Sequence, residues 1–216
     1  MAKMTQGEMH GVVLEILARR LIGIIRMKRY HHAVEIAEAL TRGGLTILEY
    51  TMSGEGALDC VTAVRAALGD RVCVGAGTVL DATAAEAAIA AGARFLVTPA
   101  VVPEVIEVGR RRDVPVVCGA LTPTEVLAAS RAGADLVKLF PARLGGPGYV
   151  RDLLGPFPQL QLVATGGVSA ENARTFLDAG AVAVAVGGNL VSEQAVHEGR
   201  WAAIEANARA CVEAVQ

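Results

Sequence analysis

The residue best placed to do chemistry in this chain is a lysine inside an apolar run. Lys138 lies in segment 135–141, whose sequence DLVKLFP is typical of a buried parallel strand. Side chains alternate along a strand, so Lys138 shares its direction with Leu136 and Phe140. Apolar surroundings disfavour the charged ammonium, and a neutral lysine amine can form a Schiff base with a ketone. The alternative is a lysine neutralised by one carboxylate, and this segment alone does not separate the two.

Glu49 is the candidate partner of this lysine. It lies in another apolar run, where alternation turns Ile47, Glu49 and Thr51 toward one face. The runs that hold Glu49 and Lys138 are the second and sixth predicted strands. Alternate strands of a closed barrel contribute to one layer of interior side chains, so the two residues can face each other. An amine and a carboxylic acid in one pocket suit proton-shuttled amine chemistry.

A repeated unit organises the rest of the chain. An Ala-rich amphipathic helix, a Gly or Pro stop and a short Val/Ile/Leu strand recur at intervals of about twenty to twenty-five residues. The predicted strands are 21–26, 45–50, 72–75, 94–98, 114–118, 135–140, 161–164 and 182–186. Eight such units favour an α/β fold of the (β/α)8 TIM-barrel type. An open doubly wound sheet is the alternative, but Gly75-Ala76-Gly77 lacks the third glycine of a dinucleotide fingerprint.

Helix signals mark two places along the chain. Apolar residues from Val13 to Leu21 recur at helical spacing, so we expect residues 1–20 to form an N-terminal helix that covers one end of the barrel. Segment 122–125, sequence TPTE, combines a threonine cap, a proline at the first helical position and a capping-box glutamate. We expect all 216 residues to form a single domain.

The C-terminal ends of the predicted strands carry polar and glycine residues. In barrels of this type the active site lies at this C-terminal rim. The residues expected there are Arg26, Glu49, Thr51, Thr78, Thr98, Pro99, Lys138, Thr165, Gly166, Gly167, Gly187, Gly188 and Asn189. The last two strands end in glycine-rich turns, which allow backbone N–H groups to approach an anion. Two such turns at adjacent rim positions favour a phosphate site.

Composition and spacing exclude several classes of function. A net charge of −2 provides no basic surface for nucleic acid, and no apolar stretch is long enough to span a membrane. The four cysteines are widely spaced without a C-x-x-C pair, so we expect reduced thiols and a cytoplasmic protein. The four histidines are scattered without metal-ligand spacing, and we expect no metal.

Taken together, the motifs resemble a known family. The chain from about residue 24 to about residue 191 resembles the Schiff-base aldolases that cleave 2-keto-3-deoxy-6-phosphogluconate (KDPG) and 4-hydroxy-2-oxoglutarate (KHG). The motifs that carry the resemblance are Leu48-Glu49, Gly75-Ala76-Gly77-Thr78-Val79-Leu80, Val97-Thr98-Pro99, Leu121-Thr122-Pro123-Thr124-Glu125, Val137-Lys138-Leu139-Phe140-Pro141-Ala142 and Thr165-Gly166-Gly167-Val168.

The resemblance implies a role for each part of the rim. Lys138 would form the Schiff base, Glu49 would be the general acid and base, and Thr78 would hold the pyruvoyl carboxylate. The loops 165–167 and 187–188 would take the phosphate, with Asn189 beside them. Pro99 and Phe140 complete the expected substrate-binding set. The resemblance further implies a small 2-keto acid substrate carrying a phosphate, no cofactor, and a homotrimer.

The chain also departs from the family pattern. Many relatives have a carboxylate-binding arginine at the position of Ser53, and Arg26 is our candidate replacement. Relatives often have Pro at Cys118, Glu at Arg143 and Ser at Asn189. The gluconate series, the galactonate series and unphosphorylated hydroxy-keto acids all stay open as substrates. An epimerase or isomerase without covalent catalysis, and a binding barrel without turnover, are the remaining alternatives.

Overall fold

Eight parallel strands close into a barrel. The computed structural model describes residues 11–216, and its strands pair in chain order, with β8 closing against β1. The strands are β1 (Leu21–Ile25), β2 (Ile47–Thr51), β3 (Cys73–Gly77), β4 (Leu96–Val97), β5 (Val116–Ala120), β6 (Leu136–Leu139), β7 (Leu162–Thr165) and β8 (Ala183–Val186). Each predicted strand overlaps one of these. The predicted (β/α)8 TIM barrel is therefore confirmed.

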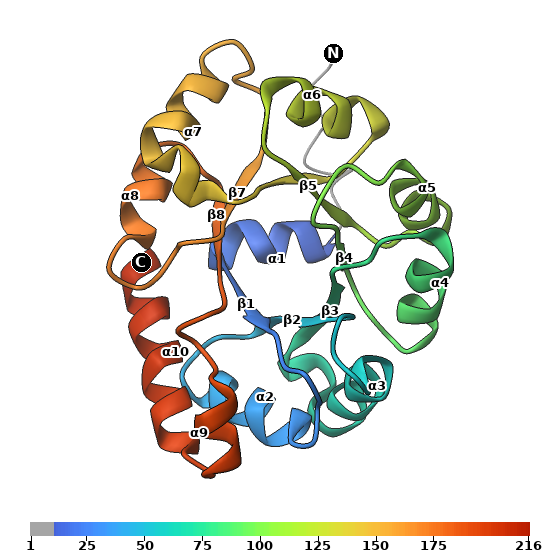
Figure 1. The fold of residues 1–216 in the computed structure, drawn as a ribbon, viewed down its shortest axis with the longest axis vertical. Helices are drawn as coiled ribbons and strands as arrows, with labels where there is room; N and C mark the ends of the chain where they lie inside the picture. The colour runs from blue at the N-terminus through green and yellow to red at the C-terminus, as the bar shows by residue number, and fades with distance from the viewer. Residues whose placement is uncertain (1–10) are drawn as a thin grey trace.

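Helices alternate with the strands and surround the barrel. They are α1 (Gly11–Arg19), α2 (Ala33–Arg42), α3 (Ala57–Leu68), α4 (Ala82–Ala90), α5 (Pro103–Arg112), α6 (Pro123–Ala132), α7 (Gly146–Leu154), α8 (Ala173–Asp178), α9 (Glu193–His197) and α10 (Trp201–Val215). Short 3₁₀ turns follow α3 (η1, Gly69–Arg71) and β6 (η2, Ala142–Leu144). Figure 1 looks down the barrel, with this ring of helices outside the strands. None of the helices in residues 11–216 has the length and apolar character needed to cross a membrane.

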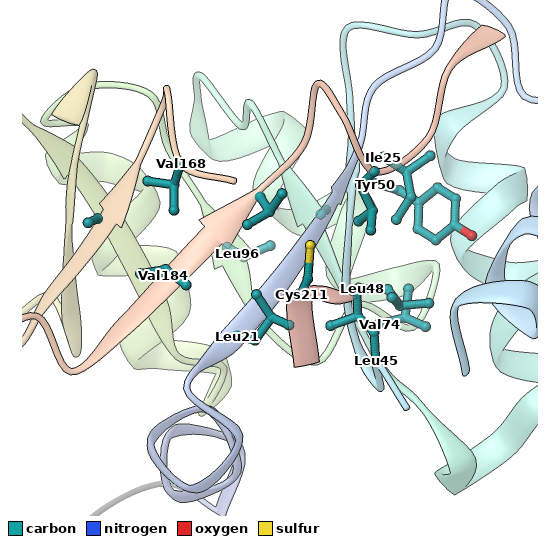
Figure 2. Packing of buried hydrophobic residues seen from close by; sticks show 14 of the residues in the cluster. Leu21, Ile25, Leu45, Leu48, Tyr50, Val74, Leu96, Val168, Val184 and Cys211 are labelled. Carbon is teal, nitrogen blue, oxygen red and sulfur yellow. The ribbon is translucent and has the colours of Figure 1, made fainter. Parts of the chain in front are cut away.

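Strand alternation divides the buried residues into two layers. One set of strand side chains points outward and packs against the helices. Figure 2 shows part of this layer, including Leu21 of β1, Leu48 of β2 and Cys211 of α10. The side chains are mostly small and aliphatic, which suits a sheet covered on its whole outer face. This layer holds the strands at fixed positions, and thereby fixes the rim.

The second layer fills the barrel interior and is closed at one end by α1. Val12, Val13 and Ile16 of α1 are 3%, 3% and 0% exposed and pack with inward-facing strand residues. Figure 1 shows α1 crossing the barrel opening. The helix expected over residues 1–20 is observed from Gly11 onward, and residues 1–10 lie outside the described part. Leu21, the last residue of the apolar spacing, begins β1, in agreement with the predicted strand 21–26.

The predicted start of α6 is confirmed in detail. Thr122 Oγ1 accepts a hydrogen bond from the Glu125 N–H at 3.3 Å, and the Thr122 N–H donates to Glu125 Oε2 at 2.8 Å. Pro123 occupies the first helical position. This capping box satisfies backbone N–H groups that the helix itself leaves without acceptors.

Candidate active site

Lys138 lies inside the barrel near the C-terminal end of β6. Lys138 is 4% exposed. It lies two residues after Leu136, on the same face of β6, and Leu136 belongs to the interior layer. The Nζ atom lies 5.3 Å from the centroid of the Phe140 ring, within the range of a cation–π contact. The neighbouring inward position on β5 is Gly119, which has no side chain to crowd the lysine. The amine is therefore buried inside the barrel, next to the Phe140 ring.

Glu49 meets this lysine across the interior. Its side chain is 1% exposed, and its Oε1 atom lies 3.9 Å from Lys138 Nζ. This separation exceeds the length of a direct hydrogen bond, which is at most about 3.2 Å. Glu49 Oε1 is also buried without a hydrogen-bond partner among the described residues. A buried carboxylate oxygen without a protein donor is suited to exchange protons with a bound molecule.

Two glycines of β3 make room for this pair. A Cβ atom placed on Gly77 would lie 2.5 Å from Glu49 Cγ and closer still to the carboxylate. A Cβ atom on Gly75 would lie 2.5 Å from the ring of Phe95. These two inward positions of β3 therefore carry no side chain, and Glu49 of β2 and Phe95, which precedes β4, fill the space. In the sequence these glycines form an incomplete dinucleotide motif and part of the family resemblance, and neither signal predicts that they make room for Glu49.

Pro99 reaches the site through a similar close approach. A Cβ atom on Gly119 would lie 2.5 Å from the Pro99 carbonyl oxygen. Buried Thr98 holds this turn, because its Oγ1 donates to the Ala100 carbonyl at 2.6 Å and accepts from the Gly119 N–H at 3.0 Å. The turn after β4 thus lies against the strand next to Lys138.

Arg26 and Thr78 come together at the rim. Arg26 Nη2 lies 3.5 Å from Thr78 Oγ1, although the two residues follow different strands. Those strands, β1 and β3, lie on either side of β2, so the arginine side chain spans the end of β2. Ser53, just beyond β2, is exposed, and its Oγ lies 3.2 Å from Thr51 Oγ1. The Arg26 guanidinium therefore lies at the C-terminal rim beside Thr78.

Tyr30 fixes the loop that carries Arg26. Its hydroxyl oxygen lies 2.9 Å from the Ile25 carbonyl oxygen and 3.0 Å from the Thr51 carbonyl oxygen, and it accepts from the Thr51 N–H at 3.1 Å. The ends of β1 and β2 are thereby joined through one side chain. Burial raises the pKa of Tyr30, so the hydroxyl stays protonated at neutral pH. The sequence does not predict this role of Tyr30, because Thr51 becomes its neighbour only when β1 and β2 pair.

The glycine loop after β7 has the conformation that only glycine adopts readily. Gly166 and Gly167 have φ of +87° and +86°. Thr165, at the end of β7, is 2% exposed. A Cβ atom on Gly166 would lie 3.0 Å from the Phe140 ring, so the loop packs directly on the turn that follows Lys138.

The loop after β8 lies beside it on the barrel rim. A Cβ atom on Gly187 would lie 3.3 Å from Ile24 Cβ, whereas one on Gly188 would meet open space. Asn189 is exposed, and its carbonyl accepts a hydrogen bond from Asn207 Nδ2 at 3.1 Å. Because β7 pairs with β8, the two glycine loops are neighbours.

The histidines are less scattered than their sequence positions suggest. Three of them gather where the loop after β1 meets α9, because β1 and β8 are paired. The hollow there measures about 260 Å³, and its lining residues are Met27, Lys28, Arg29, His31, His32, Glu193, Val196 and His197. His10 lies outside the described residues. Residues 11–216 contain no group of three or more His, Cys, Asp or Glu side chains positioned to hold a metal ion.

These features define the class of protein. The fold is a closed parallel (β/α)8 barrel, and a buried amine and carboxyl group lie 3.9 Å apart inside it, near the C-terminal ends of the strands. Residues 13–207 match the family model described as KDPG and KHG aldolase. The chain belongs to the KDPG and KHG aldolase family. It is an aldolase, a lyase that acts on a carbon–carbon bond.

Individual relatives agree with this assignment. A 2-dehydro-3-deoxy-phosphogluconate aldolase of Pseudomonas aeruginosa is 36% identical over 197 residues, which cover 90% of this chain and 88% of the relative. A KHG/KDPG aldolase of Escherichia coli K12 is 32% identical over 194 residues, which cover 89% and 91%. The crystal structure of a KDPG aldolase from Legionella pneumophila, with pyruvate captured as a covalent carbinolamine, superposes with a TM-score of 0.86 at 28% identity, covering 95% of this chain and 98% of that chain.

Proposed function

We propose that this chain is a class I aldolase that cleaves KDPG to pyruvate and glyceraldehyde 3-phosphate through a Schiff base on Lys138. The observation that carries the proposal is the 3.9 Å separation of Lys138 Nζ and Glu49 Oε1, with side chains 5% and 1% exposed. A nucleophilic amine and a proton carrier are thereby buried next to each other inside the barrel. The names of the relatives and the carbinolamine trapped in the Legionella pneumophila enzyme support the same chemistry.

The first half of the reaction forms the imine. The Lys138 amine attacks the C2 ketone, and the carbinolamine loses water to give a protonated imine. Glu49 moves the protons for this dehydration. The gap between its Oε1 and Nζ is too long for a direct hydrogen bond and suits a bridging hydroxyl or water.

The second half breaks the carbon–carbon bond. Glu49 removes the proton of the C4 hydroxyl through a water, the C3–C4 bond breaks, and its electrons pass to the imine as an enamine. Glyceraldehyde 3-phosphate leaves as the aldehyde. Protonation of the enamine at C3 and hydrolysis of the imine release pyruvate and restore Lys138. These steps require a lysine, a carboxylate and water.

The rim residues supply the binding contacts in this proposal. Arg26 and Thr78, 3.5 Å apart, hold the substrate carboxylate in place of an arginine at Ser53. The loops 165–167 and 187–188, with Asn189, receive the phosphate through backbone N–H groups. Pro99 and Phe140 form apolar walls on either side of the reacting carbons.

Two further substrates are compatible with the same site. KHG would give pyruvate and glyoxylate through the same steps, and one relative is named KHG/KDPG aldolase. The 6-phosphogalactonate analogue differs from KDPG in the configuration of a hydroxyl group. A structural neighbour named KDPGal superposes with a TM-score of 0.82 at 28% identity.

Pyruvate release from all three compounds tests the proposal. We expect the highest kcat/KM with KDPG, and no turnover by Lys138→Ala. Glu49→Gln keeps the side-chain size but cannot act as a base, and we expect it to lower kcat by about 100-fold or more. Substantial turnover by a clean preparation of Lys138→Ala would contradict the Schiff-base scheme.

We also propose a cytoplasmic homotrimer. Leu80 and Leu144 are 57% and 69% exposed, which is compatible with burial against another subunit. The four cysteines are buried free thiols, as in a reducing compartment. Light scattering on a size-exclusion column would give three times the chain mass of 22.3 kDa. A monomer mass at micromolar concentration would contradict the trimer.

A further inference from the structure

Arg143 lies beside the glycine loop that we assign to the phosphate. It belongs to η2, which joins β6 to α7. The Arg143 N–H donates to the Gly166 carbonyl at 2.9 Å, so the two loops are joined by a backbone hydrogen bond. The position of Arg143 relative to Gly166 and Gly167 is therefore fixed at the main chain.

The arginine side chain runs across Gly167. A Cβ atom on Gly167 would lie 2.5 Å from Arg143 Cβ and 3.3 Å from both Cγ and Cδ. The guanidinium begins at the next atom after Cδ, so the cation lies next to this loop. Arg143 forms no ion pair with a carboxylate among residues 11–216. Its charge is thus free to meet an anion from solution.

The two rim arginines lie at opposite sides of the buried pair. Arg26 reaches Thr78 across the end of β2, and Arg143 lies in the turn that follows β6. Glu49 of β2 and Lys138 of β6 meet inside the barrel between these two arginines. This layout matches a substrate with a carboxylate at one end, a ketone near it, and a second anion at the far end. A planar guanidinium suits a phosphate, because its N–H groups can bind two oxygens together.

We propose that Arg143 binds the distal phosphate and makes this enzyme selective for phosphorylated 2-keto-3-deoxy acids over their unphosphorylated forms. The inference rests on the proposed function, and it assigns specificity to a side chain in addition to the backbone of the glycine loops. The cation is exposed, so it adds a contact that solvent and salt partly screen.

Kinetics with two sugar acids test the selectivity. KDPG and 2-keto-3-deoxygluconate differ only in the phosphate, and the ratio of their kcat/KM values measures what the phosphate contributes. We expect Arg143→Gln to lower this ratio about tenfold, mainly through the KM for KDPG, and Arg143→Glu to lower it further. The control is Arg151→Gln, which removes an exposed arginine of α7 and should leave the ratio unchanged. An unchanged ratio in both Arg143 variants would overturn the inference.

Calorimetric titration with inorganic phosphate tests the same contact without turnover. We expect Arg143→Gln to weaken phosphate binding about tenfold and Arg151→Gln to leave it unchanged. Equal affinity in wild type and Arg143→Gln would overturn the inference even if aldol cleavage is observed. Conversely, absence of cleavage in the wild type with Arg143-dependent phosphate binding would reject the proposed function and keep Arg143 as an anion ligand.

Discussion

Replacing Gly77 by alanine should displace the carboxylate of Glu49 from its position beside Lys138. The added Cβ would lie 2.5 Å from Glu49 Cγ, whereas carbon atoms pack at about 3.5 Å or more. Glu49 must therefore move by at least about 1 Å at Cγ, and further at the carboxylate. Gly77 does not have a positive φ, so alanine brings no backbone strain and the effect is purely steric. A displacement of this size in a catalytic group costs about 100-fold in rate.

The assay is kcat with KDPG, combined with a double-mutant cycle. We expect Gly77→Ala to lower kcat about 100-fold and to destabilise the fold by about 1–3 kcal/mol, as overpacking does. In a Glu49→Ala background the crowding atoms are gone, so adding Gly77→Ala should cost little further rate or stability.

Gly75→Ala on the same strand is the matched control. Its Cβ would meet the Phe95 ring instead of Glu49, so its cost should be the same with or without Glu49. The reasoning is refuted if Gly77→Ala keeps wild-type kcat, or if its cost is undiminished in the Glu49→Ala background. Should Gly77→Ala alone not fold, the double variant with Glu49→Ala is expected to fold, and its failure would count equally against the argument.

Three further predictions concern parts of the structure around the site. Tyr30→Phe removes a hydroxyl that joins the ends of β1 and β2, so thermal unfolding should show a loss of about 1–2 kcal/mol in the free energy of unfolding. The KM should rise because Arg26 is less well held. Unchanged stability and KM would argue against this role. Hydrogen bonds from the backbone N–H groups of Thr122 and Leu121 lower the pKa of Glu125, so its stabilisation is present above its unfolded pKa and is lost as pH falls through its folded pKa. Glu125→Gln should therefore lower Tm at neutral pH and match wild type in acid, and a difference that is the same at both pH values would contradict this. Burial raises the pKa of Cys60 and of Cys73 to about 12, so both thiols should resist alkylation at pH 8 in the folded protein and react after unfolding. Mass spectrometry of the alkylated protein checks this. Rapid alkylation of the folded protein would contradict their burial.

The barrel and the pairing of Lys138 with Glu49 could be predicted from the sequence because they depend on short-range periodicity. The recurring helix and strand unit predicted eight strands, and strand alternation predicted which neighbours share a face with Lys138 and Glu49. Both predictions follow from side-chain patterns that repeat every two residues in a strand and every 3.6 residues in a helix. The capping box at Thr122 was predictable for the same reason.

Contacts that join distant strands were not accessible in this way. Gly77 leaves space for a side chain of β2, and Tyr30 binds backbone groups at the ends of two strands. The three histidines at the hollow come together only because β8 closes against β1. In each case the role of the residue depends on which strands are neighbours in the barrel, and the local sequence pattern does not predict it.

The most direct test of the account is borohydride reduction in the presence of pyruvate, followed by peptide mapping. The chain has three lysines, Lys3, Lys28 and Lys138, so the site of any adduct can be assigned without ambiguity. The account predicts a reduced pyruvate adduct on Lys138, lost in Lys138→Arg. An adduct confined to another lysine, or none at all, would contradict covalent catalysis and favour an epimerase or isomerase in the same barrel.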